Sequence, residues 1–206
     1  MGKMSKFVVA AGLVIALGGI AQANMVPNAS FEVADTAGTM PDAWTVLQAP
    51  GKVVWSTEAH TGSKSMELQY NNPEAIISPT DRIAVTAGTE YTFSAWLKST
   101  NGAEAVGPNA RLKWFDAAGD VVEIDYGWNN WQWYAVTAPI EWTELTAVTI
   151  EAPAGAATVE YAWLYTWKGD QTSGVYIDDV SMTPEPATMG LLALGGLALL
   201  RRRRRS

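Results

Sequence analysis

The 206-residue sequence contains no cysteine and a single histidine, His60. These absences exclude disulfide bridges, a thiol nucleophile and a thiolate metal site, and they leave little support for a Ser-His-Asp triad or a histidine-based zinc site. Glycine-rich phosphate-binding loops are absent as well. Stability must therefore come from a hydrophobic core, alone or together with a hard cation held by oxygen ligands.

Basic residues are scarce in the body of the chain. The two terminal segments described below hold seven of the 14 lysines and arginines, so residues 24–183 keep seven (14 − 7) against 20 acidic residues (21 less Glu185). Seven against twenty gives this region a formal charge of −13. Such a charge disfavours nucleic acid and anionic lipid as partners and favours neutral ligands or cations.

Long apolar runs occur only at the two ends. Near the N-terminus, Lys3 and Lys6 precede an apolar stretch over residues 7–20 and the small-x-small sequence Ala21-Gln22-Ala23. This order predicts a signal peptide over residues 1–23, cleaved before Asn24, and hence an exported protein. The alternative is a retained N-terminal anchor.

The C-terminal segment, residues 184–206, has three parts in a fixed order. Pro184-Glu185-Pro186 comes first, an apolar stretch over residues 187–200 follows, and five arginines occupy 201–205. Because proline restricts the residue before it and lacks an N–H, a helix can begin only after Pro186. Its 14 residues would be about 21 Å long, so this helix would span a membrane only with local thinning and snorkelling arginines.

The arginines would stay on the cytoplasmic side by the positive-inside rule, which places everything before Pro184 outside. A buried C-terminal helix is the alternative, and five consecutive arginines disfavour it. The three-part order resembles the PEP-CTERM sorting signal of Gram-negative and related bacteria, with Pro184, Glu185 and Pro186 as its name motif. The resemblance implies an exosortase-type processing enzyme as partner, and a transmembrane tether followed by delivery to the cell surface or extracellular matrix.

Residues 24–183 have the pattern of an all-β domain. In residues 90–98, Tyr91, Phe93 and the other odd positions alternate with polar or amphipathic residues, as expected of a half-buried strand. Further strand-like runs cover 53–57, 65–70, 82–85, 110–115, 121–124, 131–137, 148–151, 159–168 and 175–182. Turn signals separate them, and no helical stripe occurs between the terminal segments. We predict one domain, a two-sheet antiparallel jelly-roll sandwich.

All ten tryptophans and all seven tyrosines lie in this domain. The flat face of Trp stacks on the C–H surface of sugars, whereas its N–H needs a partner when buried. An acidic, Trp-rich exported domain is therefore a candidate for carbohydrate binding, although most tryptophans of a β-sandwich belong to the core.

Several separated segments support this reading by a resemblance. They are residues 28–32, 60–65, 88–98, 152–156 and 174–180, together with Pro41, Trp44 and Trp131. In this order they resemble the carbohydrate-binding modules of the families 4, 9, 16 and 22 type, which are galactose-binding-like jelly rolls. The resemblance covers nearly all of residues 24–183, and it implies polysaccharide as the ligand.

Three carboxylates stand out as candidate metal ligands. Glu32 lies near the start of the domain and Asp178 and Asp179 near its end, and an unpaired carboxylate cluster needs a cation. Oxygen ligands suit Ca²⁺. In the resembled modules a structural calcium sits here, completed by backbone carbonyls of the segment matching residues 60–64. The alternative is that these acids only accept hydrogen bonds from loop amides.

The candidate sugar-binding residues are Trp128, Trp133, Trp167, Arg111 and Lys113. Trp128 lies in a turn-like segment, and Trp167 precedes Lys168-Gly169-Asp170. Leu112 and Trp114 should face the core, which leaves Arg111 and Lys113 for sugar hydroxyls or carboxylates. Trp131 matches a scaffold position.

On the strand over residues 159–168, two orientations are open. Either Tyr161, Trp163, Tyr165 and Trp167 all face the core, or they line a groove while Ala162 and Leu164 face inward. The high apolar content of this strand favours the core for Tyr161 and Trp163.

The sequence does not favour an enzyme. Glycoside hydrolysis needs two carboxylates about 5 to 9.5 Å apart, and no acid here stands in an apolar, cleft-like context. We expect a non-catalytic, polysaccharide-binding domain that is sorted to the cell surface. The alternative is a structural or adhesive matrix protein whose jelly roll binds no sugar.

Overall fold

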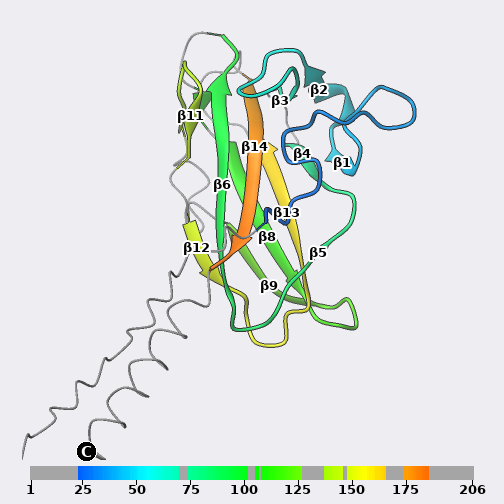
Figure 1. Ribbon diagram of the computed structural model, residues 1–206, viewed down its shortest axis with the longest axis vertical. Coiled ribbons are helices and arrows are strands. Elements are labelled where there is room, and N and C mark those ends of the chain that lie inside the picture. Colours follow the sequence, from blue (N-terminus) through cyan, green and yellow to red (C-terminus); the bar gives the residue numbers. More distant parts are fainter. Residues whose placement is uncertain are drawn as a thin grey trace, which may run out of the picture. The chain divides into compact units, whose positions relative to one another are not determined.

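Two antiparallel six-stranded sheets make up the fold in a computed structural model of the protein (Figure 1). The residues described are 23–69, 74–101, 105–106, 108–126, 137–145, 148–165 and 174–185. Residues 22–185 form one compact unit, whereas residues 1–22 of the predicted signal peptide and the whole predicted sorting helix lie outside the described residues. Within the described ranges, no helix is long and apolar enough to cross a membrane.

The first sheet, called the β13 sheet, has the order β1-β4-β13-β8-β9, with β5 also pairing with β13. Its strands are β1 (Trp44–Gln48), β4 (Ala75–Pro79), β5 (Ile83–Ala84), β8 (Pro108–Phe115), β9 (Val121–Tyr126) and β13 (Thr158–Tyr165). A short 3-10 helix, η1 (Pro50–Lys52), follows β1.

The second sheet, called the β14 sheet, has the order β11-β6-β14-β3-β2, with β12 also pairing with β6. Its strands are β2 (Val53–Ser56), β3 (Ser65–Leu68), β6 (Glu90–Ser99), β11 (Thr143–Glu144), β12 (Val148–Glu151) and β14 (Val175–Pro184). A two-stranded ribbon joins β7 (Ala105–Val106) and β10 (Thr137–Ala138). In Figure 1, β6 and β14 run side by side across the front, with β8 and β13 behind them.

The core fills the space between the two sheets, and alternation along the strands decides which side chains enter it. The β6 pattern is confirmed: Tyr91, Phe93, Ala95 and Leu97 are buried, while the residues between them are half-buried. On β13, the inner row is Val159, Tyr161, Trp163 and Tyr165, all in the main core cluster. Burying each such large apolar side chain contributes about 1.5 to 3 kcal/mol.

The orientation of β13 settles the two options that the sequence leaves open. Tyr161 and Trp163 face the core as predicted, and Tyr165 joins them. Ala162 and Leu164 belong to a separate buried cluster with Ile76 of β4. Because successive side chains of a strand point to opposite faces, this second cluster lies on the face of the β13 sheet that is turned away from the main core.

A break in register shapes the middle of β14. Asp178 pairs with Trp96 and Ser181 with Ser94, so β14 has an irregularity between these two positions. Asp179 adopts a left-handed φ of 44°, and the Val180 N–H donates to the carbonyl of Ala29. This bulge brings the opening segment of the domain onto its closing strand, with Asp178 and Asp179 at the junction.

Candidate functional site

The outer face of the β13 sheet is the first candidate site. We define it as the side chains of β4, β8 and β13 that alternate with the core residues: Ile76, Ser78, Asn109, Arg111, Lys113, Glu160, Ala162 and Leu164. Strand register places Leu164 between Ile76 and Asn109, and it places Lys113 between Glu160 and Ile124 of β9. An apolar centre is thus flanked by polar and charged side chains, as in many sites for small polar ligands.

An ion pair lies on this face. Arg111 Nη2 is 2.7 Å from Glu160 Oε1, and both side chains are only about a fifth exposed (22% and 21%). Partial burial strengthens the pair relative to one on open surface and fixes the guanidinium plane. The Lys113 Nζ lies 5.3 Å from the ring centroid of Phe115.

Three buried polar atoms on the outer face are unsatisfied. Ser78 Oγ, Asn109 Oδ1 and Arg111 Nε are inaccessible to solvent and have no hydrogen-bond partner within the described part of the chain. Buried polar groups are nearly always hydrogen-bonded, because leaving one unpaired costs about 1 to 3 kcal/mol. Such groups can be satisfied by a bound polar ligand or by water.

Two of the five predicted sugar-binding residues therefore share one face. Arg111 and Lys113 alternate with Leu112 and Trp114, which are fully buried, as the sequence predicts. Trp128, Trp133 and Trp167 lie outside the described residues, as does Trp131. The polar residues Ser78 and Asn109 were not predicted, because nothing in the sequence distinguishes them from the many serines and asparagines of loops.

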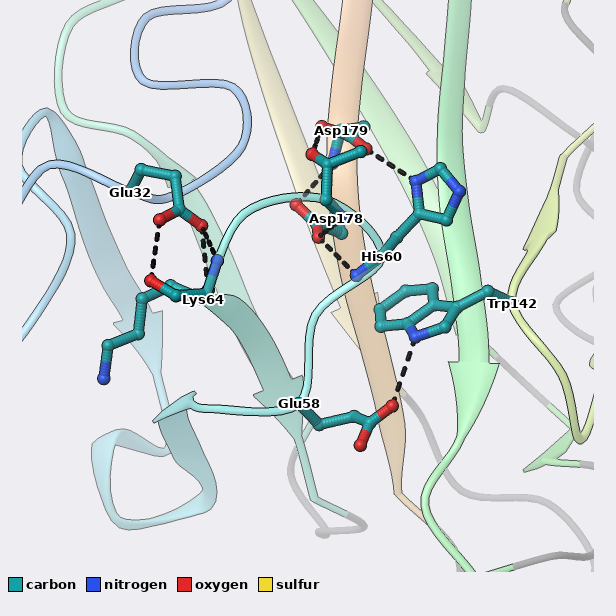
Figure 2. A network of polar contacts seen from close by, with 9 residues as sticks. Glu32, Glu58, His60, Lys64, Trp142, Asp178 and Asp179 are labelled. Atoms are coloured by element: carbon teal, nitrogen blue, oxygen red, sulfur yellow. Dashed lines mark hydrogen bonds and ion pairs between the residues drawn. The ribbon is translucent and has the colours of Figure 1, made fainter.

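The three predicted metal ligands bind one loop, residues 57–64, between β2 and β3 (Figure 2). Asp178 is fully buried, and its Oδ2 accepts the backbone N–H groups of His60 (2.8 Å) and Thr61 (3.2 Å). Asp179 contacts the side chains of the same two residues, with Oδ2 2.7 Å from His60 Nδ1 and Oδ1 2.7 Å from Thr61 Oγ1. Burial raises the pKa of Asp178 to about 6 against the lowering effect of these amides.

Glu32 holds the other end of this loop. Its Oε1 accepts the N–H groups of Ser63 and Lys64, both at 2.8 Å, and its Oε2 accepts the Ser63 hydroxyl at 2.9 Å (Figure 2). These bonds lower the pKa of Glu32 against the opposing effect of desolvation. Gly62 makes room for the carboxylate: a Cβ there would lie 2.4 Å from Oε1, and the residue has a left-handed φ of +66°.

The calcium prediction can be compared with this arrangement. The donor types fit, because Glu32, Asp178 and Asp179 all supply carboxylate oxygens next to one loop. Among the residues that the structure describes, however, no three acidic or histidine side chains come together as a metal-binding group. The carboxylates accept loop N–H groups, which is the alternative that the sequence left open. Calcium at this loop stays a prediction.

An aromatic cluster next to the loop was not predicted. The His60 ring stacks on Trp96 of β6, with centroids 3.6 Å apart and planes 11° apart, and Trp142 lies against the same imidazole. Glu58 Oε1 accepts Lys98 Nζ (2.8 Å) and Trp142 Nε1 (3.2 Å), as Figure 2 shows for the second bond. The outward position of Trp96 in the β6 alternation was the available signal.

Comparisons with known proteins identify the C-terminal segment. The PEP-CTERM protein-sorting motif matches residues 183–205. The motif implies an exported protein that is sorted to the cell surface and processed by an exosortase. No curated protein sequence is significantly similar to this chain.

Solved structures with the same fold include several carbohydrate-binding modules. The CBM22-1 xylan-binding domain of Paenibacillus barcinonensis Xyn10C has a TM-score of 0.52 at 19% identity, covering 77% of this chain and 92% of its own. A family 16 carbohydrate-binding module has a TM-score of 0.52 at 20% identity, covering 78% and 99%. The sandwich is thus the fold of these modules.

Enzymes also contain this fold. The enzymatically active domain of tailspike protein 4 of bacteriophage CBA120 has a TM-score of 0.56 at 19% identity over 78% of this chain, but only 21% of the tailspike chain is covered. A Stig cyclase from Fischerella is another match. At these identities the comparisons show the fold alone.

Proposed function

We propose that this protein is a non-catalytic carbohydrate-binding domain, with polysaccharide as its ligand and a PEP-CTERM tail for delivery to the cell surface or extracellular matrix. The observation that supports it most is the set of unsatisfied buried polar atoms on the outer face of the β13 sheet: Ser78 Oγ, Asn109 Oδ1 and Arg111 Nε. Sugar hydroxyls both donate and accept hydrogen bonds, so a sugar that displaced the groups burying these solvent-inaccessible atoms would satisfy the mixed set.

The surrounding residues support the same class of ligand. The Arg111–Glu160 pair, about a fifth exposed, offers hydrogen bonds at the edge of this face. Ile76, Ala162 and Leu164 are buried, so they would contact sugar C–H groups only if the outer face opened. The tail adds to this support, because a surface-sorted protein meets polysaccharide.

Affinity electrophoresis tests the proposal. Residues 24–185 are run through gels that contain glucans, xylans, mannans or bacterial exopolysaccharide, with calcium present. We expect at least one polysaccharide to retard the protein. Asn109→Leu, which keeps the branched side-chain shape and removes the unpaired Oδ1, should weaken the retardation while a thermal melt shows that the domain is still folded.

Substitutions of two lysines give a matched comparison. Lys113→Met removes a charge from the outer face, whereas Lys52→Met removes one from η1, where Lys52 is exposed. Reduced retardation of the first variant alone places the sugar on the outer face. If no polysaccharide retards the protein, the structural or adhesive matrix protein becomes the better interpretation.

A further inference from the structure

The last strand of the domain runs directly into the sorting tripeptide. β14 ends at Pro184, and its pairing with β6 continues without a gap from Ser181 opposite Ser94 to Pro184 opposite Tyr91. Thr183 lies opposite Thr92. The first proline of the tripeptide is therefore part of the folded sheet.

The backbone hydrogen-bonding pattern of β14 suits a proline at position 184. Met182 turns its polar backbone away from β6: its N–H donates to the Asn24 side chain, and its carbonyl accepts the Met25 N–H. Residues two apart in a strand face the same edge, so Pro184, which has no N–H, also faces away from β6. The next residue then points toward β6, and the Glu185 N–H donates to the Glu90 carbonyl at 2.8 Å.

The Glu185 side chain is held as well. Its Oε1 accepts a hydrogen bond from Thr92 Oγ1 of β6. Thr92 Oγ1 in turn lies 2.9 Å from Thr149 Oγ1 of β12. Thr92 is half-buried, whereas Glu185 and Thr149 are exposed, so the contact lies on the outward face of the β14 sheet, near the start of β6.

We propose that this contact is a latch: the folded domain holds the sorting tripeptide through Glu185, and processing requires these last residues to detach from β6. The inference rests on the sorting part of the proposed function. Enzymes that cleave peptides commonly bind them as extended strands, through the same backbone groups that a sheet uses. A backbone N–H bonded to Glu90 is not available to an enzyme until the strand end opens locally. Thr92 is thus a positioning residue: it belongs to the folded domain and holds the tripeptide through its hydrogen bond to Glu185.

Hydrogen exchange measures the latch directly. Because Pro184 and Pro186 have no N–H, Glu185 carries the single amide hydrogen of the tripeptide. In the full chain, reconstituted in lipid and labelled with ¹⁵N-glutamate, we expect this amide to be protected. Thr92→Val keeps the β-branched shape and removes the hydroxyl, so it should speed exchange by roughly two- to tenfold, the range for one lost hydrogen bond.

Thr149→Val is the matched control. It removes the hydroxyl that contacts Thr92 but leaves the hydrogen bond between Thr92 and Glu185 in place. It should leave exchange at Glu185 nearly unchanged. An unprotected Glu185 amide in the wild-type chain, or equal effects of the two variants, would overturn the latch.

Processing in the native host tests the consequence. Pulse-chase labelling should show faster loss of the C-terminal segment for Thr92→Val than for the wild type. A four-residue Gly-Ser insertion between Thr183 and Pro184 should be faster still, and adding Thr92→Val to it should have no further effect, because the tripeptide has already left the sheet.

Equal rates for wild type, Thr92→Val and the insertion would overturn the gating role while leaving sorting intact. A complete absence of processing in every chain, the insertion included, would instead overturn the sorting function and the gating role with it. The two failures are therefore distinguishable.

Discussion

Gly62 shows how much of the loop geometry depends on one residue. Gly62 and Gly38 both have a left-handed φ, of +66° and +70°. Of these two, only Gly62 has the side chain of another residue, Glu32, in the space that an added Cβ would occupy. Gly38 has nothing within 4 Å of such an atom. Comparing the two glycines therefore separates backbone strain from steric conflict.

Gly38→Ala should cost about 1 to 2 kcal/mol from the positive φ alone. Gly62→Ala should cost more, because the Glu32 carboxylate must move and release the N–H groups of Ser63 and Lys64. Urea unfolding of both variants gives the comparison. Equal losses would show that the Glu32 contact contributes nothing measurable.

Glu58 is predicted to make stability depend on pH. Its hydrogen bond with Lys98 lowers the pKa of this carboxyl below the ordinary value of 4.5, with a further bond from Trp142. A carboxyl whose pKa is lower in the folded state stabilises the fold above its unfolded pKa and loses that effect as the pH falls through the folded pKa.

Glu58→Gln should therefore lower stability by about 0.3 to 1 kcal/mol at neutral pH, the range of a partly exposed ion pair. The difference from the wild type should shrink as the pH falls below 4.5. Thermal melts across this range give the measurement, with Glu123→Gln on the exposed edge strand β9 as the control. A pH-independent difference would contradict the ion-pair account.

At the scale of elements, alternation decided what could be predicted. β6 places one face in the core and one outside it, so its sequence alternates and its inner row could be assigned in advance. From Tyr161 to Tyr165, β13 is buried on both faces, so its sequence left two orientations open and favoured the core only for Tyr161 and Trp163. All five residues of β4 are buried, and that strand has no alternation to recognise. β4 was therefore missed. β1, which is mostly half-buried, was missed as well, although the sandwich itself was predicted.

The site follows the same logic. Arg111 and Lys113 could be assigned to the face away from the core because their strand alternates. The approach of Glu32, Asp178 and Asp179 to one shared loop was expected because they lie at the two ends of the domain. Sugar binding and metal binding by these residues stay predictions. What no local pattern encodes is the pairing of β4 with β13, which brings Ser78 to the outer face.

Calcium binding is a prediction about the loop between β2 and β3. Asp178 is a fully buried carboxylate next to a second acid, Asp179, and a cation would offset the cost of its charge. If calcium binds there, a concentration 100-fold above its Kd adds about 2.7 kcal/mol to stability.

We therefore expect a chelator to lower the melting temperature, calcium to restore it, and Glu32→Gln to reduce the response. Magnesium serves as the control, because it favours a smaller octahedral site with bound waters. A transition that chelation leaves unchanged would show that loop amides alone satisfy these carboxylates.

At the scale of the whole molecule, charge should decide between polysaccharides. Residues 24–183 carry −13, whereas the outer face of the β13 sheet has two basic residues, Arg111 and Lys113, beside Glu160. The long-range field therefore repels anionic polymers, even though the local face has room for a polar ligand.

We expect any retardation by a neutral glucan to be the same at about 20 mM and about 200 mM salt, since no net charge is being screened. Alginate, which is anionic, should bind weakly at about 20 mM salt. Its binding should be equal or stronger at about 200 mM salt, because salt screens the repulsion between the polymer and the acidic domain. Affinity electrophoresis in both buffers measures this. Alginate binding that falls steeply with added salt would mean that a local basic patch outweighs the charge of the whole domain.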